Sequence, residues 1–163
     1  MRRVLLATIL AVILAAPTVA GPAEHIGYRG WGPRMGISSG PDQAVVGAHL
    51  DFGNFADHFR LQPNAELGIG SDRTVLALNG EFAYRFVADW DTWSPYLGGG
   101  LGLNITNRDG RRGFEDDSST DLGASMVGGI EKNIMNGDRF FIETKIGLVD
   151  SPDLKFEVGW TFF

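Results

Sequence analysis

The sequence contains no cysteine. This absence excludes disulfide bonds, thiolate metal sites and a lipid-modified cysteine anchor. It also lacks any apolar run of about 18 residues, the minimum for a transmembrane helix. Signals for other helices are scarce, because the 23 glycines are spread through the apolar stretches and each would weaken a helix by roughly 1 kcal/mol relative to alanine. These absences leave β-strands as the main expected element.

The N-terminus has the pattern of a targeting segment. Arg2 and Arg3 precede a short apolar run, residues 4–16, and small residues follow up to Ala20. The run is too short to span ~30 Å of hydrocarbon, so we predict a secretory signal peptide over residues 1–20 and one domain over residues 21–163. The chain has 14 Lys and Arg against 20 Asp and Glu, which argues against nucleic acid as a partner.

What the sequence does contain is alternation of apolar and polar residues. In the last segment, Leu154, Phe156, Val158, Trp160 and Phe162 alternate with polar or small residues. A period of two predicts a strand with one apolar and one polar face. Short turns and one long polar loop, residues 106–120, separate such segments, which predicts an all-β fold: an eight-stranded antiparallel up-and-down β-barrel. The predicted strands cover residues 31–38, 44–52, 59–69, 74–86, 95–105, 121–132, 139–149 and 154–163.

The charges lie on the polar faces of these strands. Alternation alone does not say which face is inside: a soluble barrel has an apolar interior, whereas a transmembrane barrel has charges inside and apolar residues against lipid. The predicted export, the aromatic final strand and the aromatics at strand ends favour a membrane barrel, and the aromatics predict a girdle at each of the two membrane interfaces. The predicted interior polar network consists of Arg34, His49, Asp51, Arg60, Glu66, Glu81, Arg85, Glu131, Glu143, Lys145, Lys155 and Glu157.

The last six residues carry a more specific resemblance. Together with the strand pattern, Val158-Gly159-Trp160-Thr161-Phe162-Phe163 resembles the small eight-stranded outer-membrane barrels of Gram-negative bacteria, the OmpA/OmpX-like group. The resemblance implies export through the general secretion pathway to the bacterial outer membrane, with outer-membrane lipid and lipopolysaccharide as surroundings. It also implies an assembly signal read by the barrel assembly machinery, formed by Val158, Gly159, Trp160, Phe162 and Phe163.

One residue departs from this pattern. Phe162 is in phase with Trp160, whereas Phe163 is one position beyond. Either Phe163 folds back at the rim of the barrel, or the last strand shifts its register by one residue.

The interior of an eight-stranded barrel is just wide enough for side chains. Since basic and acidic residues nearly balance on the inward faces, we expect a structural plug of paired charges, with a narrow conductance along it as the alternative. Some barrels of this kind modify lipid A with a His, a Ser and an acid near the outer rim, but His25, His49 and His58 show no such pairing. We therefore expect no enzyme activity and no cofactor.

The expected function is a structural or surface-interaction role for a monomeric outer-membrane barrel. Two alternatives are a soluble, secreted lipocalin-like lipid-binding barrel and a lipid A-modifying enzyme. The acidic loop near residues 106–120 could contact a divalent cation or a partner, but its spacing does not match a calcium-binding EF-hand loop, so no metal site is assigned.

Overall fold

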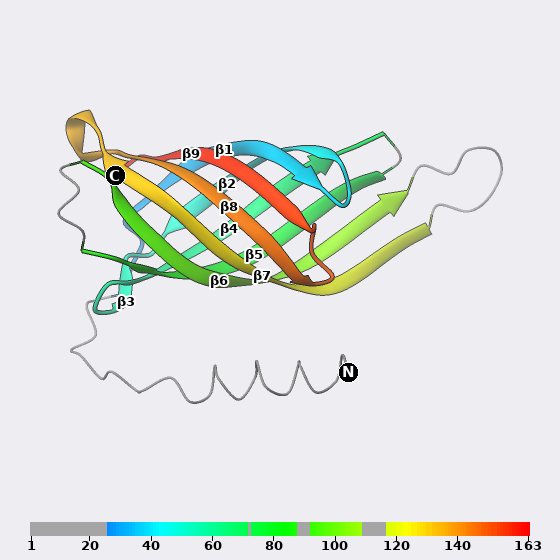
Figure 1. The fold of residues 1–163 in the computed structure, drawn as a ribbon, viewed down its shortest axis with the longest axis horizontal. Coiled ribbons are helices and arrows are strands. Elements are labelled where there is room, and N and C mark those ends of the chain that lie inside the picture. The colour runs from blue at the N-terminus through cyan, green and yellow to red at the C-terminus, as the bar shows by residue number, and fades with distance from the viewer. Residues whose placement is uncertain (1–25, 72, 88–91, 109–116) are drawn as a thin grey trace.

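The computed structural model describes residues 26–71, 73–87, 92–108 and 117–163. The predicted signal peptide and the central part of the long polar loop lie outside the described residues. Within the described part, no helix is long and apolar enough to cross a bilayer. Figure 1 shows tilted strands that wind around a single barrel.

The strands form one closed antiparallel sheet, which confirms the predicted fold. Their order is β2-β1-β9-β8-β7-β6-β5-β4-β3, and an additional β2–β4 pairing closes the ring. Eight strands make the barrel wall in the described residues, and the short β3 pairs at the start of β4. The bounds are β1 Gly30–Ser39, β2 Gln43–Asp51, β3 Asn54–Ala56, β4 Phe59–Ile69, β5 Arg73–Arg85, β6 Ser94–Arg108, β7 Asp117–Asn133, β8 Arg139–Val149 and β9 Leu154–Thr161, with a 3₁₀ turn, η1, at Met135–Gly137.

The first and last strands close the barrel. Met35 of β1 lies opposite Val158 of β9, and an isolated bridge pairs Trp31 with Phe162. The β8–β9 register runs without a shift from Ile146 opposite Leu154 to Arg139 opposite Thr161. The last strand therefore closes the barrel against the first, as the predicted up-and-down β-barrel requires.

Phe163 lies at the rim, beyond the end of β9. Its backbone N–H donates to Asp138 Oδ1 at 3.3 Å, and the Arg139 guanidinium carbon lies 4.8 Å from its ring centroid. Since β9 keeps its register, the structure selects the first of the two alternatives, in which Phe163 turns at the rim.

The barrel has two different ends. The terminal end carries the start of β1, the end of β9, β3 and η1; the loop end carries the β1–β2, β4–β5, β6–β7 and β8–β9 connections (Figure 1). At the loop end β6 and β7 reach furthest, and they stay paired out to Arg108 opposite Asp117. The prediction of a loop over residues 106–120 was therefore wrong at both edges, because the polar Ser and Thr residues there continue the hairpin beyond the apolar band.

Most of the described aromatic side chains gather at the terminal end, although Phe156 lies two residues from the loop-end start of β9. This distribution corrects the prediction of two girdles. The chain of ring contacts there runs from Phe55 through Phe59 and Tyr84 to Phe86, at centroid distances of 5.0–5.8 Å. A second chain joins Trp93, Phe140 and Trp160 at 6.1 and 4.9 Å. The prediction counted strand ends without asking at which end of the barrel each one lies, and these aromatics all flank terminal-end connections.

Candidate functional site

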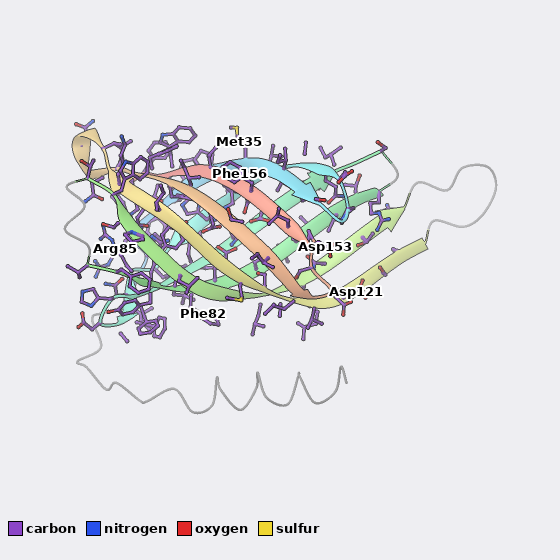
Figure 2. All side chains as sticks on the ribbon, viewed as in Figure 1. Met35, Phe82, Arg85, Asp121, Asp153 and Phe156 are labelled. Carbon is purple, nitrogen blue, oxygen red and sulfur yellow. The ribbon has the colours of Figure 1, made fainter. Side chains whose placement is uncertain are left out.

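The lumen of the barrel holds the charged residues, and the outer wall is apolar. Alternate residues of each strand point inward, so Arg34, Glu131 and Glu157 are at most 1% exposed, whereas Leu78 and Leu101 on the outer wall are 46% and 57% exposed. Figure 2 shows side chains such as Met35 and Phe82 directed away from the barrel. This distribution is the reverse of that in a soluble barrel, which has an apolar interior.

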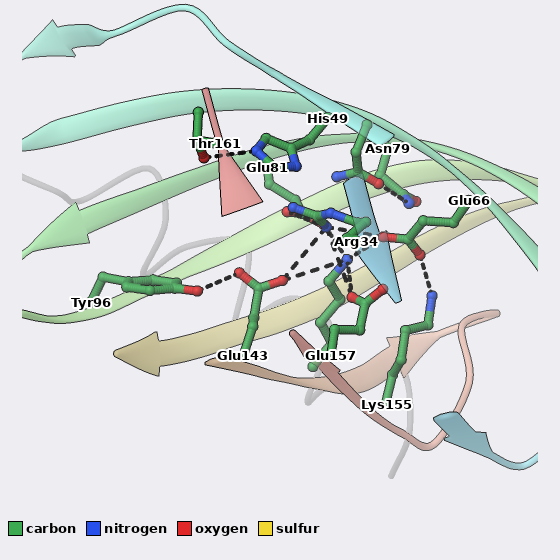
Figure 3. A network of polar contacts seen from close by, with 12 residues as sticks. Arg34, His49, Glu66, Asn79, Glu81, Tyr96, Glu143, Lys155, Glu157 and Thr161 are labelled. Atoms are coloured by element: carbon green, nitrogen blue, oxygen red, sulfur yellow. Dashed lines mark hydrogen bonds and ion pairs between the residues drawn. The ribbon is translucent and has the colours of Figure 1, made fainter. Parts of the chain in front are cut away.

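A central cluster of charges fills the middle of the lumen (Figure 3). Glu66 of β4 is the carboxylate of this cluster with the most cation partners: Arg34 Nη1 lies 3.0 Å and Lys145 Nζ 2.6 Å from Oε1, and Lys155 Nζ lies 2.5 Å from Oε2. Lys145 also pairs with three other carboxylates, at 2.5, 2.8 and 3.7 Å. The central cluster consists of Arg34, Glu66, Glu81, Glu143, Lys145, Lys155 and Glu157.

The pairing within the central cluster offsets the cost of burying its charges. Each buried ion carries a desolvation penalty of several kcal/mol, which only close partners and hydrogen bonds compensate. Four carboxylates here face three cations, and the Tyr96 hydroxyl donates a further hydrogen bond to Glu143 Oε2 at 2.8 Å. The cluster therefore ties together β1, β4, β5, β8 and β9 across the lumen.

A second group of charges lies nearer the terminal end. Glu131 accepts a hydrogen bond from Arg60 on Oε2 and forms an ion pair with Arg85, whose Nε lies 2.9 Å from Oε1. Arg139 Nη1 donates to Asp51 Oδ2 at 2.9 Å, and Asp51 Oδ1 accepts from the Gly53 backbone N–H at 2.7 Å. These residues, Asp51, Arg60, Arg85, Glu131 and Arg139, form the terminal cluster, and its Arg85 side chain is 41% exposed.

An apolar layer, the collar, lies between the two clusters. It consists of Ala83, Tyr96, Val127 and Phe141, the buried apolar cluster of the described residues. The Arg34 guanidinium carbon lies 5.4 Å from the Phe141 ring centroid, and that of Arg60 lies 5.1 Å from the Tyr96 ring centroid. Each ring therefore contacts a cation of one cluster, and Tyr96 contacts both clusters.

The structure divides the predicted polar network in two. The central cluster holds seven of its members and the terminal cluster four, as the two groups defined above show. His49 belongs to neither: its Nε2 lies 2.9 Å from Thr161 Oγ1, and its ring packs 5.3 Å from that of Phe141. Arg139 and the collar were missed, although residue parity with Glu143 already places Arg139 and Phe141 on the inward face.

The arrangement around the histidines offers little for catalysis. His49 and Thr161 are 1% and 0% exposed, and His49 Nδ1 has no hydrogen-bond partner among the described residues. Among the described residues no carboxylate hydrogen-bonds to His49, so His49 and Thr161 lack the acid that orients the histidine in a catalytic triad. His58 Nδ1 pairs with the adjacent Asp57 at 2.7 Å in the β3–β4 turn. His25 lies outside the described residues, within which no group of three potential ligands could hold a metal ion.

A closed eight-stranded antiparallel barrel with an apolar wall and an ionic lumen has the architecture of the small outer-membrane β-barrels. No protein-family model matches the sequence, and no characterised relative matches it by sequence.

Solved structures do match by fold. The crystal structure of Neisserial surface protein A has a TM-score of 0.64 at 13% identity, covering 82% of this chain and 94% of that one. The N-terminal β-barrel domain of Pseudomonas aeruginosa OprF has a TM-score of 0.57 at 11% identity, covering 82% and 98%. The outer membrane enzyme PagL has a TM-score of 0.49 at 15% identity, covering 83% and 99%. The first two matches confirm that the chain shares the fold of small eight-stranded outer-membrane barrels.

Proposed function

We propose that the protein is an integral β-barrel of a bacterial outer membrane, with a structural or surface-interaction role. The observation that carries this proposal is the placement of polarity: the charges are inside and the large apolar side chains outside. An apolar wall of this kind is stable against lipid and costly in water. A role at the cell surface agrees with the name of Neisserial surface protein A.

In this proposal the side chains that fill the lumen act as a plug. The central cluster ties five strands together, and the collar blocks the path beside it. We accordingly propose no transport role and no enzyme activity, which the lack of a substrate-accessible nucleophile beside His49 supports. The soluble lipid-binding alternative needs an apolar interior, and Glu131 and Glu157 at 0% exposure contradict it.

The assembly signal remains part of the proposal. Trp160 and Phe162 continue the outward face of β9, and Phe163 ends the chain at the terminal end. In this proposal the barrel assembly machinery reads these aromatics, with Val158 and Gly159, as the strand is paired. The finished protein is a monomer in contact with outer-membrane lipid and lipopolysaccharide.

Cell fractionation tests the location directly. Native protein should remain in the outer-membrane fraction, and an unboiled sample should migrate differently from a boiled one on a denaturing gel. Recovery of folded protein in the aqueous fraction without detergent would overturn the proposal. A separate experiment tests the enzymatic alternative. Lipid A should be chemically unchanged after overexpression of the protein, and a changed acyl pattern of lipid A would support an enzyme activity instead.

A further inference from the structure

A cavity of about 390 Å³ lies at the terminal end of the barrel. We call it the vestibule. Figures 1 and 2 show the end at which it lies, marked by the C-terminus, β3 and Arg85. Ligand pockets in proteins usually measure about 300–1,000 Å³, so the vestibule has room for a small molecule. Its main lining residues are Arg29, Arg60, Arg85, Tyr96, Arg139 and Phe163.

The vestibule is closed at its inner end. Tyr96 and Ala83 line it and also belong to the collar, so the apolar layer forms its floor. Phe163 lies at its rim, with its ring against the Arg139 guanidinium. A solute that enters from the terminal end therefore meets a charged wall, an aromatic rim and a closed floor.

Guanidinium groups outnumber side-chain carboxylates around the vestibule. Its side chains include four arginines against Asp51, Asp57 and Glu131. Glu131 is shared by Arg60 and Arg85, Asp51 pairs with Arg139, and Asp57 pairs with His58. No ion pair joins Arg29 to a carboxylate of the described residues.

Arg29 is nevertheless held in place. Its backbone N–H donates to the Asp51 carbonyl oxygen at 2.8 Å, next to the first residue of β1. The Arg29 side chain runs against Gly53, whose φ of 71° and missing Cβ leave the space that the guanidinium stem occupies. Arg139 is a second arginine of the lining: its Nη1 pairs with Asp51 Oδ2 at 2.9 Å, and its buried Nε has no hydrogen-bond partner in the described part of the chain.

We propose that the vestibule binds a small oxyanion, a carboxylate- or phosphate-bearing solute, on Arg29 and Arg139. Guanidinium groups bind such oxyanions through short, charge-assisted and often bidentate hydrogen bonds. The carbon part of the solute packs against the Phe163 ring. The inference goes beyond the proposed function and does not depend on it, because it uses only the geometry of the terminal end.

The test is isothermal titration of the folded full chain, in a non-ionic detergent, with inorganic phosphate and with succinate. We expect saturable binding at one site for at least one of the two anions. Arg29→Gln should weaken it about tenfold or more, the loss expected when one hydrogen bond to a charged group is removed. Arg73→Gln, at the loop end, is the matched control and should bind as the wild type does.

Arg29→Gln is chosen because Arg29 has no ion pair with the described residues, so the variant should fold, as unchanged gel mobility of the unboiled sample will show. Absence of saturable binding, or equal affinity of wild type and Arg29→Gln, overturns the proposal.

A phospholipid headgroup is the other source of a phosphate. Binding of short-chain phosphatidylglycerol without binding of either free anion therefore overturns the assignment to a solute.

Discussion

Single residues decide whether the lumen can hold its charges. Glu66 receives three cations, Arg34, Lys145 and Lys155, within 3.0 Å. Replacing Glu66 by Gln removes the common partner of all three cations, and breaking a buried ion pair in this way costs about 3–5 kcal/mol. We therefore expect Glu66→Gln to lower the free energy of unfolding by that amount in urea titrations of micelle-bound protein. The exposed Asp42→Asn serves as control and should change it little; a small loss for Glu66→Gln would mean that water reaches the central cluster.

Gly159 shows how tightly the collar is fitted. A Cβ at this position would collide with the Phe141 ring. Overpacking of this kind costs roughly 1–3 kcal/mol, so Gly159→Ala should destabilise the barrel by that amount in the same titration. A Cβ added at Gly80 on the outer wall would meet no atom within 4 Å, and Gly80→Ala should be nearly neutral. Adding Phe141→Leu to Gly159→Ala should recover stability, and additive losses would contradict the collision.

At this scale the sequence predicts which side chains face inward, but not their partners. Parity placed Glu66, Lys145 and Lys155 on one side of the wall. It could not show that β4 lies across the lumen from β8 and β9, because that distance depends on barrel closure and strand tilt. The split into two clusters was missed for the same reason: parity places Tyr96 and Phe141 on the inward faces of separate strands, and only the closed ring brings them together as a layer.

At the scale of the strand, the cost of a charge on the outer wall should depend on depth. Leu78 lies near the middle of β5 and faces outward, whereas Thr120 lies outward on the overhanging part of β7. Arginine on the lipid face costs about 2–4 kcal/mol at the midplane and about 0–1 kcal/mol near an interface. Leu78→Arg should therefore lower the unfolding free energy in lipid vesicles far more than Thr120→Arg. Equal losses at the two positions would argue against a bilayer around the wall.

The strands themselves were predictable because alternation is strong over many residues. The errors in the predicted bounds lie at the strand ends, where both faces of the strand carry polar residues and the apolar–polar alternation is lost. The β6–β7 hairpin runs on through Thr106, Ser118 and Ser119 without apolar partners, and β3 is only three residues long. Hydrogen bonding to a neighbouring strand extends a strand past its amphipathic part. The sequence pattern of one strand does not show how far its neighbour reaches.

At the scale of the whole molecule, the two ends should face different compartments. The chain has no native cysteine, so single cysteines can report the orientation without interference. In intact cells, Ser71→Cys at the loop end should react with a membrane-impermeant maleimide, whereas Asn136→Cys at the terminal end should react only after the cells are permeabilised. The expected pattern places the loop end outside the cell and the terminal end in the periplasm. The opposite pattern would reverse this orientation, and labelling of both cysteines in intact cells would contradict the placement of the two ends in different compartments.

The one-sided aromatics have a consequence for how insertion can be observed. Trp31, Trp93 and Trp160 all lie at the terminal end. When the unfolded chain is added to preformed vesicles, the loop-end hairpins must cross the bilayer while this end stays at the side of entry. The fluorescence of these three tryptophans of the described residues will thus record the anchoring of the barrel at the near surface, and it will not report the arrival of the hairpins on the far one.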